Sequence, residues 1–318
     1  EHALAEGLGE DYRRLLPAHL QGPIARQRPL GWLRPMPLKV AGCRFHGDIP
    51  YCEEFAENTL DLYLPEHRPG PWPVLLYIHG GAFFMGDKRQ QGRLLYNQAV
   101  AEGWAVVSIN YRLGPDHRMP AMIVDTRKAI HWIRSEGTEC GLDGGMIVSA
   151  GESAGGFLAL MTVLGHGDPC FQPGFEEADT RLQGCISLYA PNDLLGMHGC
   201  FDAEAYQAFN LKHVMPCPAQ EDIELWQRCS PMYRMHDDIP PVFVLGGTHD
   251  PLASVEETRQ LAAALRQSSS GTVVSAIYPN TTHAFDQTRS SRGEPTMQAL
   301  IRFLAWVRIM GKPQGLEG

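Results

Sequence analysis

The chain has 318 residues, 44% hydrophobic and 20% charged, an ordinary globular composition that excludes a disordered or fibrous protein. Its 36 acidic and 27 basic residues give a net charge of −9, and without a dense run of lysine and arginine, nucleic acid is not an expected partner. The longest apolar stretch, residues 157–164, falls well short of the about 20 residues that a membrane-spanning helix needs.

Residues 1–38 differ in pattern from the rest of the chain. One helical stripe of hydrophobic residues runs through the first half of this segment: Leu4, Leu8, Tyr12, Leu15 and Leu16. A proline-rich stretch then ends the stripe. We therefore expect an N-terminal helical arm followed by an irregular segment.

From residue 39 onward, short apolar runs alternate with helical patterns. The runs predicted as strands are 60–64, which is typical of an edge strand, and then 74–78, 105–109, 146–150, 185–189, 242–245 and 273–278. The helical patterns lie at 122–133, 157–164, 255–265 and 297–304. This alternation predicts an α/β fold, a doubly wound and mostly parallel sheet spanning residues 39–318.

Residues 192–232 interrupt the alternation. The segment is rich in leucine, methionine and aromatic residues but has no strand pattern. It is too long for a structureless loop in a compact domain. We expect a helical insertion over one end of the sheet, where it could roof a pocket.

Residues 151–155 match the pattern G-x-S-x-G between a predicted buried strand and a predicted helix. In that context the pattern is typical of a nucleophile elbow, a tight turn that lifts a serine above the sheet edge. Gly151 and Gly155 leave space where a side chain would clash, and Ser153 would stand at the positive end of the following helix. An ordinary strand-to-helix turn is the alternative, but the flanking elements favour a nucleophile.

A serine hydroxyl needs a base, and the base needs a carboxylate to orient it. Asp250 and His283 each follow a predicted strand, at the end where open α/β sheets bind their ligands. Each alone would more often be a turn aspartate or a surface histidine. Together with Ser153, and in the chain order Ser, Asp, His, they indicate a catalytic triad. The competitors His249 and Asp286 lack the expected order and position.

A glycine-containing loop, residues 77–83, continues directly from the strand predicted at 74–78. Such a loop lends backbone N–H groups to an oxyanion hole, and the amide after the nucleophile is the second donor. We predict an oxyanion hole formed by the amides of Gly81, Ala82 and Ala154. The side chains predicted to line the adjoining substrate pocket are Phe83, Phe84 and Glu152.

Four motifs resemble the hormone-sensitive-lipase-like carboxylesterases, bacterial esterase family IV: the loop at His79, the elbow at Ser153, residues 250–252 and His283. The match runs from about residue 60 to residue 285. The resemblance implies the α/β-hydrolase fold and hydrolysis of short- to medium-chain acyl esters. It also implies a cap built from residues 1–38 and 192–232.

Two positions depart from the family pattern. Ala82 stands where members usually have a third glycine, and its Cβ could add strain or narrow the pocket. Ala284 replaces the usual glycine after the catalytic histidine. The N–H of Ala82 can still donate, so the predicted oxyanion hole is retained.

The predicted reaction is acyl transfer to water, in which Ser153 attacks an ester carbonyl, His283 moves the proton and Asp250 orients the histidine. One alternative is an amidase of the kynurenine formamidase type, although such relatives tend to carry Trp at the position of Phe83. Another is a non-catalytic ligand-binding homologue like the gibberellin receptors. Those proteins lack the catalytic histidine, which is present here as His283.

No cofactor is expected, and the 13 histidines show no metal-site spacing such as H-E-x-x-H. Eight cysteines are scattered without a C-x-x-C pair, which is typical of reduced thiols in a cytosolic protein. Residues 1–10 are acidic and mixed, so we expect no secretory leader among them, and a leader already removed is left open because residue 1 is not Met. We expect a cytoplasmic enzyme whose partner is a small-molecule ester, and a homodimer is left open.

Overall fold

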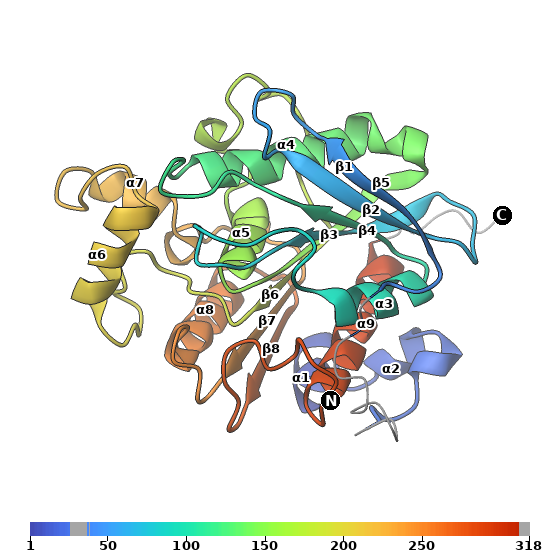
Figure 1. The fold of residues 1–318 in the computed structure, drawn as a ribbon. Helices are drawn as coiled ribbons and strands as arrows, with labels where there is room; N and C mark the ends of the chain where they lie inside the picture. The colour runs from blue at the N-terminus through green and yellow to red at the C-terminus, as the bar shows by residue number, and fades with distance from the viewer. Residues whose placement is uncertain (26–36, 38, 312–318) are drawn as a thin grey trace.

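The computed structural model describes residues 1–25, 37 and 39–311. In this part of the chain, eight strands form one sheet in the order β1-β2-β4-β3-β5-β6-β7-β8, with helices on both faces (Figure 1). Strand β2 runs antiparallel to both of its neighbours, and all pairs from β4 to β8 are parallel. The predicted doubly wound, mostly parallel sheet is confirmed.

The strands are β1 (Cys43–Pro50), β2 (Thr59–Pro65), β3 (Trp72–Ile78), β4 (Ala105–Ile109), β5 (Leu142–Glu152), β6 (Gly184–Leu188), β7 (Val242–Gly247) and β8 (Val273–Tyr278). The helices are α1 (His2–Leu8), α2 (Tyr12–Leu15), α3 (Arg93–Ala101), α4 (Ala121–Ser135), α5 (Ala154–Leu164), α6 (Ala203–His213), α7 (Ile223–Arg228), α8 (Val255–Ser268) and α9 (Gly293–Met310). Short 3-10 helices lie at Ala18–Leu20, Gly137–Cys140, Pro169–Phe171 and Pro231–Tyr233. Every strand and helix predicted from the alternation is present.

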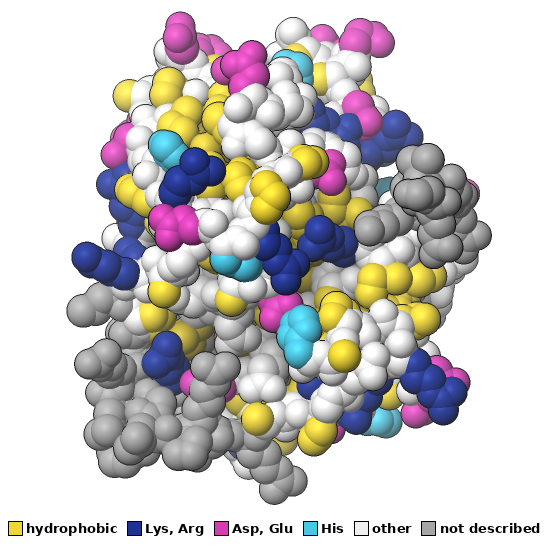
Figure 2. Space-filling view, turned by 90° about the vertical axis from the view of Figure 1, so that its right-hand side faces the viewer, with side chains coloured by type: hydrophobic (Ala, Val, Ile, Leu, Met, Phe, Trp, Pro, Cys, Tyr) yellow, Lys and Arg dark blue, Asp and Glu magenta, His cyan; other side chains and the backbone are white. Residues whose placement is uncertain are grey.

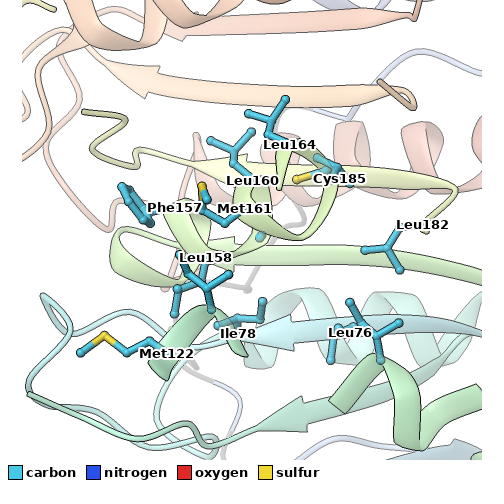
Figure 3. Packing of buried hydrophobic residues seen from close by; sticks show 14 of the residues in the cluster. Leu76, Ile78, Met122, Phe157, Leu158, Leu160, Met161, Leu164, Leu182 and Cys185 are labelled. Atoms are coloured by element: carbon cyan, nitrogen blue, oxygen red, sulfur yellow. The ribbon is translucent and has the colours of Figure 1, made fainter. Parts of the chain in front are cut away.

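The central strands are apolar on both sides because both faces of the sheet are covered. Every residue of β3 and of β4 is buried. Helices α4, α5 and α8 pack on one face, and α1, α3 and α9 pack on the other, each set with its own hydrophobic cluster. Helix α5 is buried all round, and Figure 3 shows its side chains, among them Leu158 and Leu164, pointing to different sides. The helix that follows the predicted elbow is therefore rigidly held.

Two predicted features of the N-terminal third are wrong. The strand predicted at 60–64 is not an edge strand, because β2 pairs with β4 on one side and with β1 on the other. Strand β1 is mostly exposed, so it carries no apolar alternation and depends on pairing with β2. The single stripe of the arm is split, since α1 ends at Leu8, Gly9 has a φ of 92° and α2 begins at Tyr12.

The N-terminal arm and the insertion 192–232 lie in different parts of the structure. Helix α1 packs against β8 and α2 against α9, while residues 26–36 and 38 lie outside the described part of the chain. The insertion 192–232 contains α6 and α7, which project from one end of the sheet (Figure 1). That this insertion forms a cap together with residues 1–38 stays a prediction.

Charged side chains of both signs are interspersed with hydrophobic ones on the side of the molecule turned away from α6 and α7 (Figure 2). None of the helices in the described residues combines the length and apolar character needed to cross a membrane. All eight cysteines are free thiols.

Candidate active site

The turn between β5 and α5 has the geometry of the predicted elbow. Ser153 has a φ of 54° and a ψ of −121°, a strained conformation that costs a non-glycine residue about 1–3 kcal/mol. A Cβ on Gly151 would collide with the carbonyl of Gly155, and one on Gly155 would collide with the carbonyl of Ile78. Both glycines are therefore required for the turn. The N–H of Ser153 donates to the carbonyl of Leu188 at 2.9 Å, which ties the elbow to β6.

The structure brings Asp250 and His283 together across the ends of β7 and β8. Nδ1 of His283 lies 2.7 Å from Oδ2 of Asp250, and because a carboxylate only accepts, this nitrogen is the donor. The other oxygen, Oδ1, accepts the N–H groups of Leu252 at 2.8 Å and of Ala253 at 2.9 Å. The carboxylate is buried and fixed in place, and it leaves Nε2 of His283 for other chemistry.

Ser153 and His283 both contact the chain at the end of β6. The N–H of Ser153 donates to the carbonyl of Leu188, the last residue of β6. The ring of His283 contacts the ring of the next residue, Tyr189, with centroids 4.8 Å apart. Within the described residues the Ser153 hydroxyl makes no hydrogen bond to His283. Serine–histidine contacts are often long in ligand-free enzymes and tighten when substrate binds.

The loop after β3 forms a tight turn with three consecutive residues at positive φ. Gly81, Ala82 and Phe83 have φ values of 126°, 51° and 69°, and the N–H groups of Phe84 and Met85 both donate to the carbonyl of Gly81. A Cβ on Gly81 would collide with the carbonyl of Met85, so only glycine fits there. Among the described residues, the amides predicted to bind the oxyanion have no partner: Gly81, Ala82 and Ala154.

The same loop is anchored by a histidine–tyrosine pair whose role the sequence did not reveal. The ring of His79 stacks on Tyr111 at 4.5 Å, and the Tyr111 hydroxyl donates to the His79 carbonyl at 3.0 Å. Burial lowers the pKa of His79 to about 4, so its imidazole is neutral near pH 7. Nδ1 of this neutral ring pairs with the carbonyl of Gly80 at 2.7 Å, which helps to hold the loop in shape.

The three predicted pocket residues have different surroundings. Phe83 is buried with its ring edge-on to Phe157, with centroids 5.1 Å apart. Phe84 reaches the insertion and stacks on His213 of α6. Glu152 is buried, and both of its oxygens are engaged by protein groups, so its carboxylate belongs to a polar network.

Both departures from the family pattern fall at left-handed positions. Ala82 has a φ of 51° and Ala284 a φ of 57°, a region in which a Cβ is unfavourable. The expected strain at Ala82 is therefore present.

In the described part of the chain, neither competitor of the predicted triad forms a hydrogen bond with His283. In the described residues His249 pairs with the hydroxyl of Thr248, and Asp286 accepts the hydroxyl of Tyr189 at 2.6 Å. No group of three or more His, Cys, Asp or Glu side chains in this part of the chain is arranged to hold a metal ion.

A mostly parallel eight-stranded sheet, with a strained serine between β5 and α5 and an Asp–His pair at the next strand ends, defines an α/β-hydrolase. The BD-FAE family model matches residues 60–265. Esterase LipQ of Mycobacterium tuberculosis is 36% identical over 98% of this chain and 76% of its own length. The probable carboxylic ester hydrolase LipM of the same organism is also 36% identical, over 96% of this chain and 71% of its own.

Solved structures have the same fold at lower identity. A truncated carbohydrate esterase from gut microbiota superposes with a TM-score of 0.73 at 19% identity, covering 85% of this chain and 99% of that one. A bacterial heroin esterase has a TM-score of 0.68 at 23% identity, over 84% and 86% of the two chains. The chain therefore belongs to the BD-FAE family, and the predicted membership in the hormone-sensitive-lipase-like esterases is confirmed.

Proposed function

We propose that this chain is a serine carboxylesterase that hydrolyses short- to medium-chain acyl esters through an acyl-enzyme intermediate. Its relatives LipQ and LipM are named esterase and carboxylic ester hydrolase, which supports the class of reaction. The observation that carries the residue assignment is the 2.7 Å contact between Asp250 and His283, placed at the sheet edge where the elbow presents Ser153.

The first half-reaction acylates the enzyme. Oγ of Ser153 attacks the ester carbonyl carbon while Nε2 of His283 takes the hydroxyl proton, so that the carbonyl oxygen becomes an oxyanion. When this intermediate collapses, the ester C–O bond breaks and the alcohol leaves with the proton from His283. Water then attacks the acyl group with the same histidine as base, and the acid and free Ser153 are released.

Two sets of groups stabilise the charges that develop during this reaction, the imidazolium of His283 and the oxyanion of the substrate. Asp250 donates no proton, but it holds the tautomer of His283 that leaves Nε2 basic and stabilises the imidazolium once it forms. The amides of Gly81, Ala82 and Ala154 would bind the oxyanion, where a single donor is worth about 3 kcal/mol. The positive N-terminal end of α5 adds to this field.

An aromatic contact supports the assignment of residues 192–232 to a cap. Phe84, next to the oxyanion loop, stacks on His213 at 4.8 Å and meets Phe209 at 5.9 Å, and both partners lie on α6. The insertion would thus roof the pocket of the catalytic domain, residues 39–318, whereas residues 1–38 as the other part of the cap stay a prediction. A roof held this close to the oxyanion loop favours small acyl groups.

The test is a chain-length series of p-nitrophenyl esters, from acetate to palmitate, with the full chain and its Ser153→Ala variant. Ser153→Ala should lower kcat by at least about 10³-fold. The matched control, Ser135→Ala, removes an exposed hydroxyl that bonds only within α4 and should keep full activity.

Three results would count against the proposal. Near-normal activity of Ser153→Ala would remove the nucleophile. Equal turnover of acetate and palmitate would contradict the acyl-length preference. Faster hydrolysis of N-formylkynurenine than of any ester would favour the amidase alternative.

For location and partners, we propose a cytoplasmic enzyme acting on a small-molecule ester. The eight free cysteines suit a reducing compartment. A homodimer stays a prediction, which light scattering on the purified chain would test.

A further inference from the structure

Tyr189 lies between the elbow and the histidine loop. It directly follows β6, is 1% exposed and has a φ of 39°, which a non-glycine residue adopts only where its surroundings hold it. Its N–H donates to the carbonyl of Leu245 on β7 at 2.6 Å, and the preceding carbonyl, that of Leu188, accepts the N–H of Ser153. The backbone at Tyr189 is therefore tied to both the elbow and β7.

The side chain of Tyr189 reaches the loop that carries the histidine. Its ring meets the imidazole of His283 at an interplanar angle of 64°, and its hydroxyl donates to Oδ1 of Asp286 at 2.6 Å. Asp286 is 2% exposed and lies three residues after His283 in the chain. One tyrosine thus touches the imidazole and also holds the loop on which the imidazole stands.

A second tether joins this loop to the elbow itself. Nε2 of Gln287 donates to Oε2 of Glu152 at 2.9 Å, and Glu152 immediately precedes Ser153. The other oxygen of Glu152 accepts the hydroxyl of Tyr77 on β3 at 2.6 Å, which fixes the carboxylate. Ala284 in this loop has a φ of 57°, and its carbonyl accepts the N–H of Gln287 at 3.4 Å, so the backbone turns between these two residues.

We propose that Tyr189 and Gln287, through Asp286 and Glu152, are positioning residues that hold the His283 loop in register with the elbow. The inference rests on the proposed function of Ser153 and His283. Each tether is a hydrogen bond between two side chains of the protein, one of them on the histidine loop. Their loss should therefore lower kcat and leave KM nearly unchanged, since a misplacement of about 1 Å can cost up to about 100-fold in rate.

The charge state of the network gives an independent readout. Burial, together with the charge of Glu152, raises the pKa of Asp286 to about 8, so Asp286 carries a proton at neutral pH. The titratable groups that interact with Asp286 are Glu152 on β5, Tyr77 on β3, Tyr189 after β6 and Tyr278 on β8. Arg93 on α3 lines the same cavity, and Arg292 before α9 acts on Tyr278. Ionisation of Asp286 at higher pH places a second negative charge beside that of Glu152. The repulsion should loosen the loop that carries His283.

The central test compares two tyrosine variants. Tyr189→Phe removes a hydroxyl with a 2.6 Å hydrogen bond to Asp286. Tyr51→Phe removes one that donates to the carbonyl of Asn110 at 2.6 Å and accepts from Nδ2 of Asn58 at 3.0 Å, so neither of its bonds involves the histidine loop. We expect kcat on p-nitrophenyl butyrate to fall about tenfold in Tyr189→Phe, with KM within about twofold, and to stay normal in Tyr51→Phe.

Variants of the carboxyl partner separate positioning from simple structural support. Asp286→Ala should lose kcat as Tyr189→Phe does, and the double variant should be no worse than Asp286→Ala, because both changes break one bond. Asp286→Asn keeps an acceptor oxygen but has no charge to gain. It should therefore retain kcat at neutral pH and lack the decline of wild-type kcat above about pH 8.

Each outcome is decisive in one direction. Unchanged kcat in both Tyr189→Phe and Asp286→Ala would overturn the inference. If circular dichroism shows that Tyr189→Phe does not fold, kcat and KM of Asp286→Ala carry the test. A Ser153→Ala enzyme that stays active removes the proposed function itself, whereas an inactive one combined with normal Tyr189→Phe removes only the positioning role.

Discussion

Nδ1 of His283 lies 2.7 Å from Oδ2 of Asp250, although the two residues are 33 positions apart in the chain. The aspartate is also held independently of the histidine, since its other oxygen accepts two backbone N–H groups of the turn that follows it. The carboxylate is therefore a fixed partner that orients the imidazole.

Replacing Asp250 by Asn should therefore inactivate the enzyme without unfolding it. The amide can still accept the backbone bonds at Oδ1, but its NH₂ group would face Nδ1 and favour the wrong imidazole tautomer. By analogy with serine hydrolases that use the same triad, kcat should fall about 10⁴-fold. Steady-state kinetics on p-nitrophenyl acetate measures this, and a loss below about tenfold would show that Asp250 does not orient the base.

The stack between Phe84 and His213 should control substrate binding more than turnover. Its aromatic contact, worth about 0.5–1.5 kcal/mol, links the oxyanion loop to α6. We expect His213→Ala to raise KM for p-nitrophenyl butyrate about three- to tenfold with little change in kcat. A matched control is His131→Ala on α4, which loses a ring contact with Phe175 at 5.8 Å and should leave KM unaltered. Equal KM values in the two variants would argue against the roof.

Ala284 and Ala263 should respond in opposite ways to replacement by glycine. Ala284 has a φ of 57°, so Ala284→Gly relieves left-handed strain and should raise the free energy of unfolding by about 0.5–1 kcal/mol. Ala263 is exposed in the middle of α8, where glycine should lower that free energy by about 1 kcal/mol. Urea unfolding of both variants tests the sign, and destabilisation in both would refute the strain at Ala284.

Stability should decline as the pH rises through the neutral range. Asp286 has its pKa raised to about 8 in the folded protein, whereas an aspartate in an unfolded chain titrates near about 4. Between these values the folded state holds the extra proton, so the free energy of unfolding falls with increasing pH and levels off above about pH 8. Glu257, whose pKa burial and the charge of Asp193 also raise to about 8, acts in the same direction.

Asp286→Asn should therefore flatten this slope in part, with the remainder left to Glu257. Urea titrations at about pH 5, 7 and 9 measure the slope for the wild type and the variant. An identical slope in both proteins would mean that Asp286 is already ionised at neutral pH.

Local patterns in the chain were sufficient to predict the tight turn at Ser153 and the strands of the parallel core. Gly151 and Gly155 are needed by any turn that holds Ser153 above a sheet edge, and a strand covered on both faces, such as β3, is a run of apolar residues. These features depend on residues that are close together in the chain, so they can be predicted from the sequence without knowledge of the tertiary structure. The prediction was wrong for β2 as an edge strand because the exposed β1 has no such pattern.

The contacts that hold the histidine loop depend on the tertiary structure. Tyr189 and Asp286 are 97 residues apart, and Glu152 and Gln287 are 135 apart, so nothing in their local surroundings pairs them. They meet only because β5, β6, β7 and β8 lie side by side and end at one edge of the sheet. The amino-acid sequence by itself thus predicted which groups would carry the chemistry, since the motifs and their flanking strands are local features. The packing of distant strands decided how those groups are held, since burial and pairing of polar side chains exist only once the sheet has formed.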